Sequence, residues 1–207
     1  MTAVPSTFPK KSRIGIAQIP ELRDSYRQMP SPLINTSRLV LREVVAADAP
    51  ALLALYADRE HMQWYGIDPF PDLAAAESRI RKLAEMGEAP NPATSWAIEL
   101  AGDFIGTCGL FAWNRTWRKC SIGYELTKAA QGHGYMQEAV RAVLSWGFRE
   151  MDINRVEAQT HPNNKISIAL LGRLGFTEEG RLREAAYWAS QHQDMLQFSL
   201  LRAEWDF

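Results

Sequence analysis

Two glycines separated by one residue, Gly132 and Gly134, stand directly before a stretch in which apolar residues recur at helical spacing. A strand that ends in such a loop and passes into a helix presents free backbone N–H groups and the positive end of the helix dipole. Glycine also removes the Cβ atoms that would keep an anion away from the backbone, and it permits positive φ. The segment Gln131–Met136 is therefore a candidate phosphate site.

The spacing of the glycines separates this loop from better-known phosphate loops. A dinucleotide fingerprint would need glycine at position 137, where Gln137 stands, and a P-loop would need a Gly-Lys-Ser/Thr sequence, which is absent. Both of these loop types are therefore disfavoured, and a nucleotide-phosphate enzyme that uses the same anion loop stays a third possibility. Taken alone, Gly-x-Gly is equally compatible with a structural turn.

The elements that must position this loop follow from hydrophobic periodicity. Alternation at 38–44 predicts a first strand, and two helices follow, the first after Asp48 and the second after Asp72. Further strands are expected at 95–100, 104–111, 119–126, 155–160, 181–188 and 193–201, and further helices at 136–148 and 164–174. The glycines thus fall at a strand-to-helix junction in an α+β chain.

Composition limits the class of protein. The chain has 207 residues, of which 46% are hydrophobic, and we expect one domain over residues 37–207 after a proline-rich, loosely docked arm at 1–36. A net charge of −1 argues against nucleic acid as a partner. Cys108 and Cys120 have neither CxxC nor histidine neighbours, so no metal site is expected. Without a long apolar run or a signal peptide, we expect a cytoplasmic protein that does not engage membranes.

Five short patterns, in order along the chain, carry a family resemblance. They lie at Arg38–Arg42, Ile122–Leu126, Gly132–Ala139, Asn164–Ser167 and Leu174–Gly180. Together they resemble the GNAT superfamily of N-acetyltransferases, and most closely its branch of ribosomal-protein N-terminal acetyltransferases. The resemblance spans residues 37–205.

The resemblance implies a fold and a cofactor. It implies a mixed, mostly antiparallel sheet of about seven strands, flanked by helices on both faces and splayed between strand four, at 119–126, and strand five, at 155–160. Acetyl-CoA would lie with its thioester in that splay. Ala129 occupies the first position of the family's loop, where a polar residue is usual. The implied cofactor contacts are Leu126, Ala129, Gln131, Gly132, His133, Gly134, Tyr135, Met136, Asn164 and Ser167.

Direct attack by an amine in a ternary complex is the reaction that the resemblance implies, and two residues are candidates for its proton transfers. Glu125 is either the base or a polar strand-end residue that faces solvent. Ser167 either donates to the departing thiolate or is satisfied by backbone, and Asn164 either contacts the pantetheine arm or caps a helix. Leu171 stands where many family members have a tyrosine acid. We expect the side chain of His133 to point outward from the loop.

The acceptor is expected to be a primary amine, either a protein N-terminus or a small molecule. A non-catalytic acyl-CoA-binding or regulatory module with the same fold is the alternative, and the chain is compatible with a monomer or a homodimer. Several aromatic side chains either line an acceptor groove or belong to the core. These are Trp64, Tyr65, Trp113, Tyr187 and Trp188.

Overall fold

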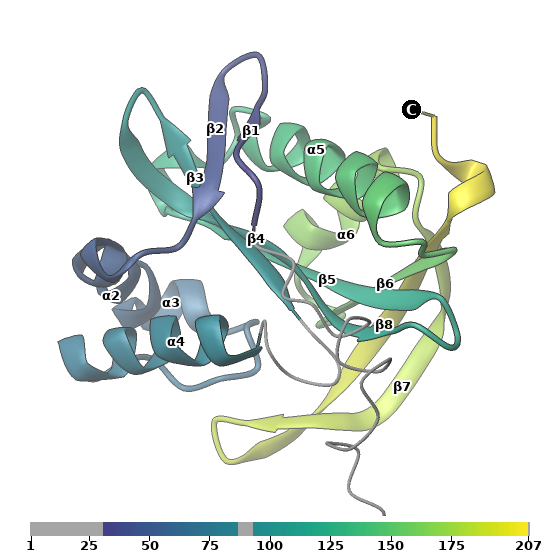
Figure 1. Cartoon of the computed structure of the whole chain (residues 1–207). Coiled ribbons are helices and arrows are strands. Elements are labelled where there is room, and N and C mark those ends of the chain that lie inside the picture. The colour runs from purple at the N-terminus through teal and green to yellow at the C-terminus, as the bar shows by residue number, and fades with distance from the viewer. Residues whose placement is uncertain (1–30, 87–92, 207) are drawn as a thin grey trace, which may run out of the picture.

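The computed structural model describes residues 31–86 and 93–206 (Figure 1). The strands are β1 (Ile34–Asn35), β2 (Leu39–Glu43), β3 (Thr94–Leu100), β4 (Asp103–Asn114), β5 (Lys119–Leu126), β6 (Arg155–Thr160), β7 (Thr177–Trp188) and β8 (Gln191–Leu201). The α-helices are α2 (Ala49–Ala57), α3 (Arg59–Met62), α4 (Leu73–Met86), α5 (Tyr135–Glu150) and α6 (Lys165–Arg173).

The eight strands form one sheet in the order β1-β2-β3-β4-β5-β6-β8-β7. Every neighbouring pair is antiparallel except β5 and β6, which confirms the expected mixed, mostly antiparallel sheet. The strand added to the expected seven is β1, in which Ile34 pairs with Leu41 of β2. It is too short to show periodicity, and it lies in the segment expected to be an arm; residues 1–30 of that arm fall outside the described residues.

The sheet opens between its two parallel strands. Pairing of β5 with β6 begins at Lys119 and Arg155 and ends at Ser121 and Glu157. Beyond that point Ile122–Leu126 continues to pair with β4, while the end of β6 continues to pair with β8. The two strands therefore diverge, which confirms the splay and opens the middle of the sheet.

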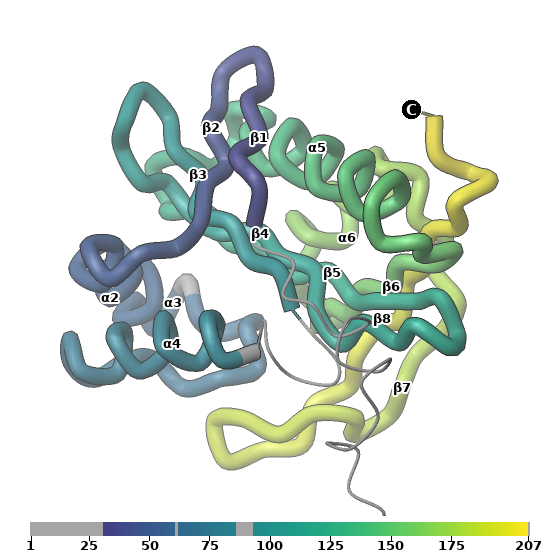
Figure 2. The backbone as a smooth tube through the Cα atoms, viewed as in Figure 1, coloured from purple at the N-terminus to yellow at the C-terminus, as the bar shows by residue number. Residues whose placement is uncertain are grey.

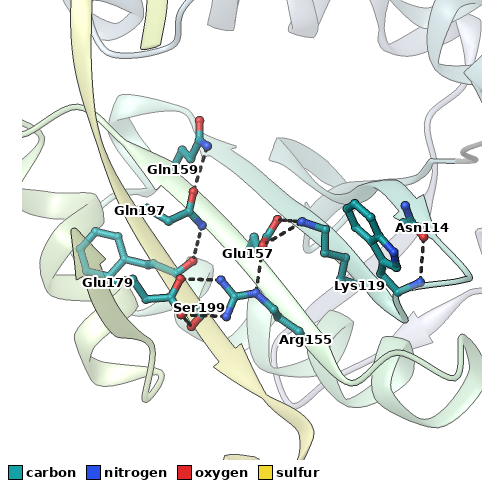
Figure 3. Close-up of polar contacts among 10 residues, drawn as sticks. Asn114, Lys119, Arg155, Glu157, Gln159, Glu179, Gln197 and Ser199 are labelled. Atoms are coloured by element: carbon teal, nitrogen blue, oxygen red, sulfur yellow. Dashed lines mark hydrogen bonds and ion pairs between the residues drawn. The ribbon is translucent and has the colours of Figure 1, made fainter. Parts of the chain in front are cut away.

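A ladder of polar side chains crosses the sheet at the closed end of this splay (Figure 3). Lys119 of β5 bonds both carboxylate oxygens of Glu157 at 3.1 Å, and Arg155 bonds Glu157 at 2.9 Å. Arg155 also reaches Glu179 of β7, and Glu179 in turn accepts a hydrogen bond from Ser199 of β8. These contacts tie four strands together where β5 and β6 are still paired.

Helices cover both faces of the sheet. The core between the sheet and helices α5 and α6 includes the fully buried Val140, Val143 and Leu144, which recur on one face of α5. A second core joins α2, α3 and α4 around Leu52 and Tyr56. Figure 2 shows α2, α3 and α4 grouped together, away from α5 and α6.

The last two strands are longer than predicted, beginning at Thr177 and Gln191 rather than at 181 and 193. A two-residue turn joins them, in which Ala189 and Ser190 both have positive φ. Such turns match the twist of a hairpin, but neither residue is one that signals them in a sequence. The strand ends were therefore not visible in the sequence.

Candidate active site

A cavity of about 910 Å³ lies at the opening between β5 and β6. Its walls come from the α3–α4 region, the outer half of β5, the glycine loop, the end of β6 and the start of α6. Most residues proposed from the sequence for the cofactor and the chemistry line it. These are Glu125, Leu126, Gln131, Gly132, Gly134, Tyr135, Met136, Asn164 and Ser167. Ala129 and His133 do not belong to the lining.

The glycine loop follows a short 3-10 turn, Lys128–Ala130, at the end of β5. Gly132 and Gly134 have φ of 83° and 78°, a region that side-chain-bearing residues rarely adopt, and Gly134 is the N-cap of α5. The Gln131 side-chain amide donates to the carbonyl of Leu126 at 3.2 Å and so closes the loop on the strand. The strand–loop–helix order predicted for this segment is what the structure contains.

The loop is suited to an anion. Among the described residues, the backbone N–H groups of Gly132, Gly134 and Tyr135 donate to no backbone carbonyl. A Cβ atom at Gly132 would meet nothing within 4 Å, so this backbone lies open to the cavity. Unpaired N–H groups at the start of α5 and the positive end of its dipole fit a pyrophosphate. The exposed His133 ring stacks on Tyr135 with ring centroids 5.5 Å apart, outside the cavity lining.

Arg38 binds the glycine loop, although sequence analysis placed it only in the family pattern. Its Nε bonds Glu138 at 2.7 Å, another guanidinium nitrogen donates to the carbonyl of His133 at 3.0 Å, and its Cζ lies 4.6 Å from the Tyr135 ring centroid. Partial burial raises the pKa of Glu138. Hydrogen bonds from Thr36, Ser37 and Arg38 outweigh this effect and lower the pKa to about 2. Arg38 and Glu138 both belong to the family patterns, but they are 100 positions apart in the chain, so the sequence did not predict their contact.

Glu125 lies on the cavity wall, and two neighbouring hydroxyls bind one oxygen of its carboxylate. The hydroxyls of Tyr56 from α2 and Thr107 from β4 both donate to Oε1. Among the described residues nothing donates to Oε2, and this oxygen is not sealed away from solvent. Burial raises the pKa of Glu125, although the two hydroxyls and the nearby positive charge of Arg79 lower it in part.

Arg79 of α4 reaches the same part of the cavity. Its Nε is buried without a hydrogen-bond partner among the described residues. Burial raises the pKa values of Glu125 and Tyr56, and the positive charge of Arg79 offsets part of this rise. Neither Arg79 nor Tyr56 was singled out from the sequence for chemistry. The apolar periodicity of α2 accounts for Tyr56 as a core residue, and that of α4 accounts for Arg79 as a surface residue. The sequence therefore gives no sign that either residue lines the cavity.

Ser167 lies on the opposite wall, in the first turn of α6. Its hydroxyl is 2.9 Å from the Tyr124 hydroxyl, so a side chain rather than the backbone satisfies it. Its N–H donates to Oδ1 of Asn164 at 3.1 Å, which makes Asn164 the N-cap of the helix while it also lines the cavity. Leu171 is fully buried in the core and cannot present a group to the cavity.

The two thiols are separate from the chemistry. Cys108 and Cys120 are both buried, and neither lines the cavity. Burial raises the pKa of both thiols, that of Cys120 to about 12, so each stays protonated at neutral pH. A thiol is a poor nucleophile compared with its thiolate. The site therefore supplies no cysteine for an acyl-enzyme.

The aromatic residues divide into two groups. Trp64 and Tyr65 line the cavity, and the Trp64 ring stacks on His161 with ring centroids 4.6 Å apart. Trp113 is only 7% exposed and lies in the core, while Tyr187 is 62% exposed on the surface of β7. Trp188 is buried but does not line the cavity, and its indole N–H donates to the carbonyl of Gln63 at 3.1 Å. Of the five aromatic residues considered for an acceptor groove, Trp64 and Tyr65 are therefore the two that line the cavity.

Known proteins resemble this chain in sequence and in fold. The family model described as an acetyltransferase (GNAT) domain matches residues 38–177. An uncharacterised N-acetyltransferase, p20 of Bacillus licheniformis, is 33% identical over 83% of this chain and 97% of its own length. The [ribosomal protein uS5]-alanine N-acetyltransferase of Escherichia coli is 28% identical over 86% of this chain and 94% of its own. A crystal structure of a probable acetyltransferase is 26% identical, with a TM-score of 0.76, over 84% of this chain and 99% of that one.

The splayed sheet with a glycine loop at its opening is the arrangement of an acetyl-CoA-dependent N-acetyltransferase. The chain belongs to the GNAT family of N-acetyltransferases. In the part of the chain that the structure describes, no helix is long and apolar enough to cross a membrane.

Proposed function

We propose that this enzyme transfers the acetyl group of acetyl-CoA to a protein or peptide N-terminal amine, by direct attack within a ternary complex. The observation that carries the proposal is the shared cavity, in which Glu125 and Ser167 occupy facing walls beside the glycine loop. When bound, acetyl-CoA supplies the thioester carbonyl that is attacked and the sulfur that leaves. The loop backbone and Asn164 would hold it.

Glu125 is proposed as the general base. The free oxygen Oε2 would accept the proton that the amine loses, while Tyr56 and Thr107 hold Oε1 in place. A carboxylate with a raised pKa is better matched to an amine at neutral pH than an ordinary one. Ser167 is proposed to donate a hydrogen bond to the sulfur as negative charge develops there.

Arg79 supports a peptide N-terminus over a polyamine as acceptor. A polyamine carries a second ammonium group near its first, and that group would meet the Arg79 guanidinium in the same cavity. A peptide has one N-terminal amine and neutral carbonyl groups beyond it, which the guanidinium can bind. The Escherichia coli relative is named as an alanine N-acetyltransferase of ribosomal protein uS5, which agrees with this choice.

The test is thiol release from acetyl-CoA with three acceptors: peptides beginning with alanine or serine, spermidine, and an amino sugar. We expect turnover with the peptides and an acetyl group on their N-terminal nitrogen by mass spectrometry. Turnover with spermidine alone would refute the peptide assignment. Binding of acetyl-CoA without turnover on any acceptor would instead favour a non-catalytic module.

A further inference from the structure

The Tyr124 hydroxyl has no role in the proposed function, yet it contacts the serine that does. Tyr124 lies in β5 three residues beyond Ser121, the last β5 residue paired with β6, and its hydroxyl is 2.9 Å from Oγ of Ser167. Both residues line the cavity. We propose that Tyr124 is a positioning residue for acetyl transfer, whose hydroxyl donates to Ser167 and directs the serine hydrogen toward the departing sulfur.

The direction of this hydrogen bond follows from acidity. A phenol is a stronger acid than an aliphatic alcohol, so the bond is stronger when Tyr124 donates and Ser167 accepts. The serine hydrogen is then free, because neither hydroxyl bonds any third group among the described residues. Burial raises the pKa of Tyr124 to about 12, although the bond to Ser167 lowers it in part. The phenol therefore keeps its proton at neutral pH.

Both partners are fixed from outside the pair. Asn164 accepts the N–H of Ser167 at 3.1 Å, which sets the serine in the first helical turn. The Tyr65 hydroxyl donates to the backbone carbonyl of Tyr124 at 3.3 Å, and the Tyr124 ring packs against the main core. The pair replaces the acid that Leu171 cannot supply, because that leucine is buried in the core.

The proton movements balance as follows. The Ser167 hydroxyl gives its proton to the sulfur as the carbon–sulfur bond breaks and leaves its electron pair on sulfur. The Ser167 oxygen recovers a proton from water, while Tyr124 keeps its own proton and its hydrogen bond to Ser167. The proton lost by the attacking amine leaves through Glu125 to water. One proton thus passes from the amine to the sulfur, and no oxidant or further reactant is needed.

Calorimetric binding of CoA and of desulfo-CoA, which lacks the sulfur, tests the pair without turnover. The two ligands are compared below and above about pH 8.5, the ordinary pKa of a thiol. In the wild type, we expect the preference for CoA over desulfo-CoA to rise about tenfold at the higher pH, the strength of a hydrogen bond to a charged group. Tyr124→Phe and Ser167→Ala should each lose that rise, and the double variant should lose no more.

Tyr187→Phe is the matched control, since Tyr187 is an exposed tyrosine away from the cavity, and it should behave as wild type. Tyr124→Phe should also lower kcat while KM for acetyl-CoA stays near its wild-type value. Equal weakening of both ligands, or an unchanged pH dependence, would overturn the proposal. This inference rests on the proposed role of Ser167. If Ser167→Ala lowers turnover while Tyr124→Phe behaves as wild type, only the inference fails; if neither variant lowers turnover, the role of Ser167 fails as well.

Discussion

Tyr124 and Glu125 are neighbours in β5, and their side chains contact helices on opposite faces of the sheet. Tyr124 bonds Ser167 of α6, whereas Glu125 bonds Tyr56 of α2. Successive residues of a strand point to opposite faces of the sheet, so Tyr124 and Glu125 contact different helices although they are adjacent in sequence. Because β5 has left β6 at this point, the two faces communicate through the opening. The proposed reaction uses one face for the amine proton and the other for the sulfur.

Burial of the Glu125 carboxylate is expected to lower the free energy of unfolding at neutral pH, where the proposed base is ionised. Its raised folded-state pKa means that protonation favours the folded form. The corresponding stability is present below the ordinary carboxyl pKa and is lost as pH rises through the raised value. Glu125→Gln, which keeps an acceptor oxygen for both hydroxyls, should therefore have the higher Tm at pH 8 and a smaller advantage at pH 5. Thermal unfolding at the two pH values measures this, with the exposed Glu178→Gln as control. If the Tm difference between Glu125→Gln and the wild type were the same at pH 5 and pH 8, burial would not raise the pKa of Glu125.

The pair of Arg38 and Glu138 predicts the opposite pH dependence. Glu138 has a folded-state pKa of about 2, so its stabilising effect is complete above the ordinary carboxyl pKa and disappears as pH falls toward 2. Glu138→Gln should cost about 1.5–3 kcal/mol of unfolding free energy at pH 7, the usual contribution of a hydrogen bond to a charged group. It should also weaken acetyl-CoA binding, because Arg38 loses its anchor beside the loop.

Urea unfolding at pH 7 and pH 3 checks the Glu138 prediction. Glu77→Gln is the control, since Glu77 is an exposed residue whose nearest contact with Arg81 is 4.0 Å, and it should change stability by less than about 0.5 kcal/mol. A loss for Glu138→Gln that is as large at pH 3 as at pH 7 would show that the carboxylate charge is not the cause.

The left-handed backbone of Gly134 predicts a cost for any side chain there. With φ of 78°, Gly134→Ala should lose about 1–2 kcal/mol of stability and weaken acetyl-CoA binding. Gly172→Ala is the matched control, because Gly172 lies inside α6 with no atom within 4 Å of the added Cβ. That change should stabilise by about 0.5–1 kcal/mol without altering affinity. Unchanged affinity in Gly134→Ala would remove the loop from the cofactor site.

Direct transfer predicts that the enzyme carries no acetyl group between substrates. Incubation with acetyl-CoA in the absence of an amine should give no acetylated protein in intact-mass spectra. Cys120→Ala should retain turnover, because the thiol is buried and protonated. A stable acetyl adduct that an added amine discharges would establish a covalent route instead.

Local patterns predicted most of the fold and the glycine loop. The strand, glycines and helix around that loop are contiguous in the sequence. Asn164 and Ser167 were proposed from the family pattern, whose residues fall within one helical turn. The partners of these residues were not predictable. Tyr56 lies 69 positions before Glu125, and only tertiary packing of α2 on the sheet brings them together. The sequence also left open which group satisfies the Ser167 hydroxyl, because its partner Tyr124 lies in β5, 43 positions earlier in the chain.

The central claim is that Glu125 is the base in acetyl transfer to a peptide N-terminal amine. The most direct measurement is kcat for acetyl-CoA with a saturating alanine-initiated peptide, in the wild type and in Glu125→Gln. We predict wild-type turnover and a loss of about 10²–10⁴-fold in the variant, the usual contribution of a positioned base. Equal kcat values for the two proteins on that peptide would contradict the claim.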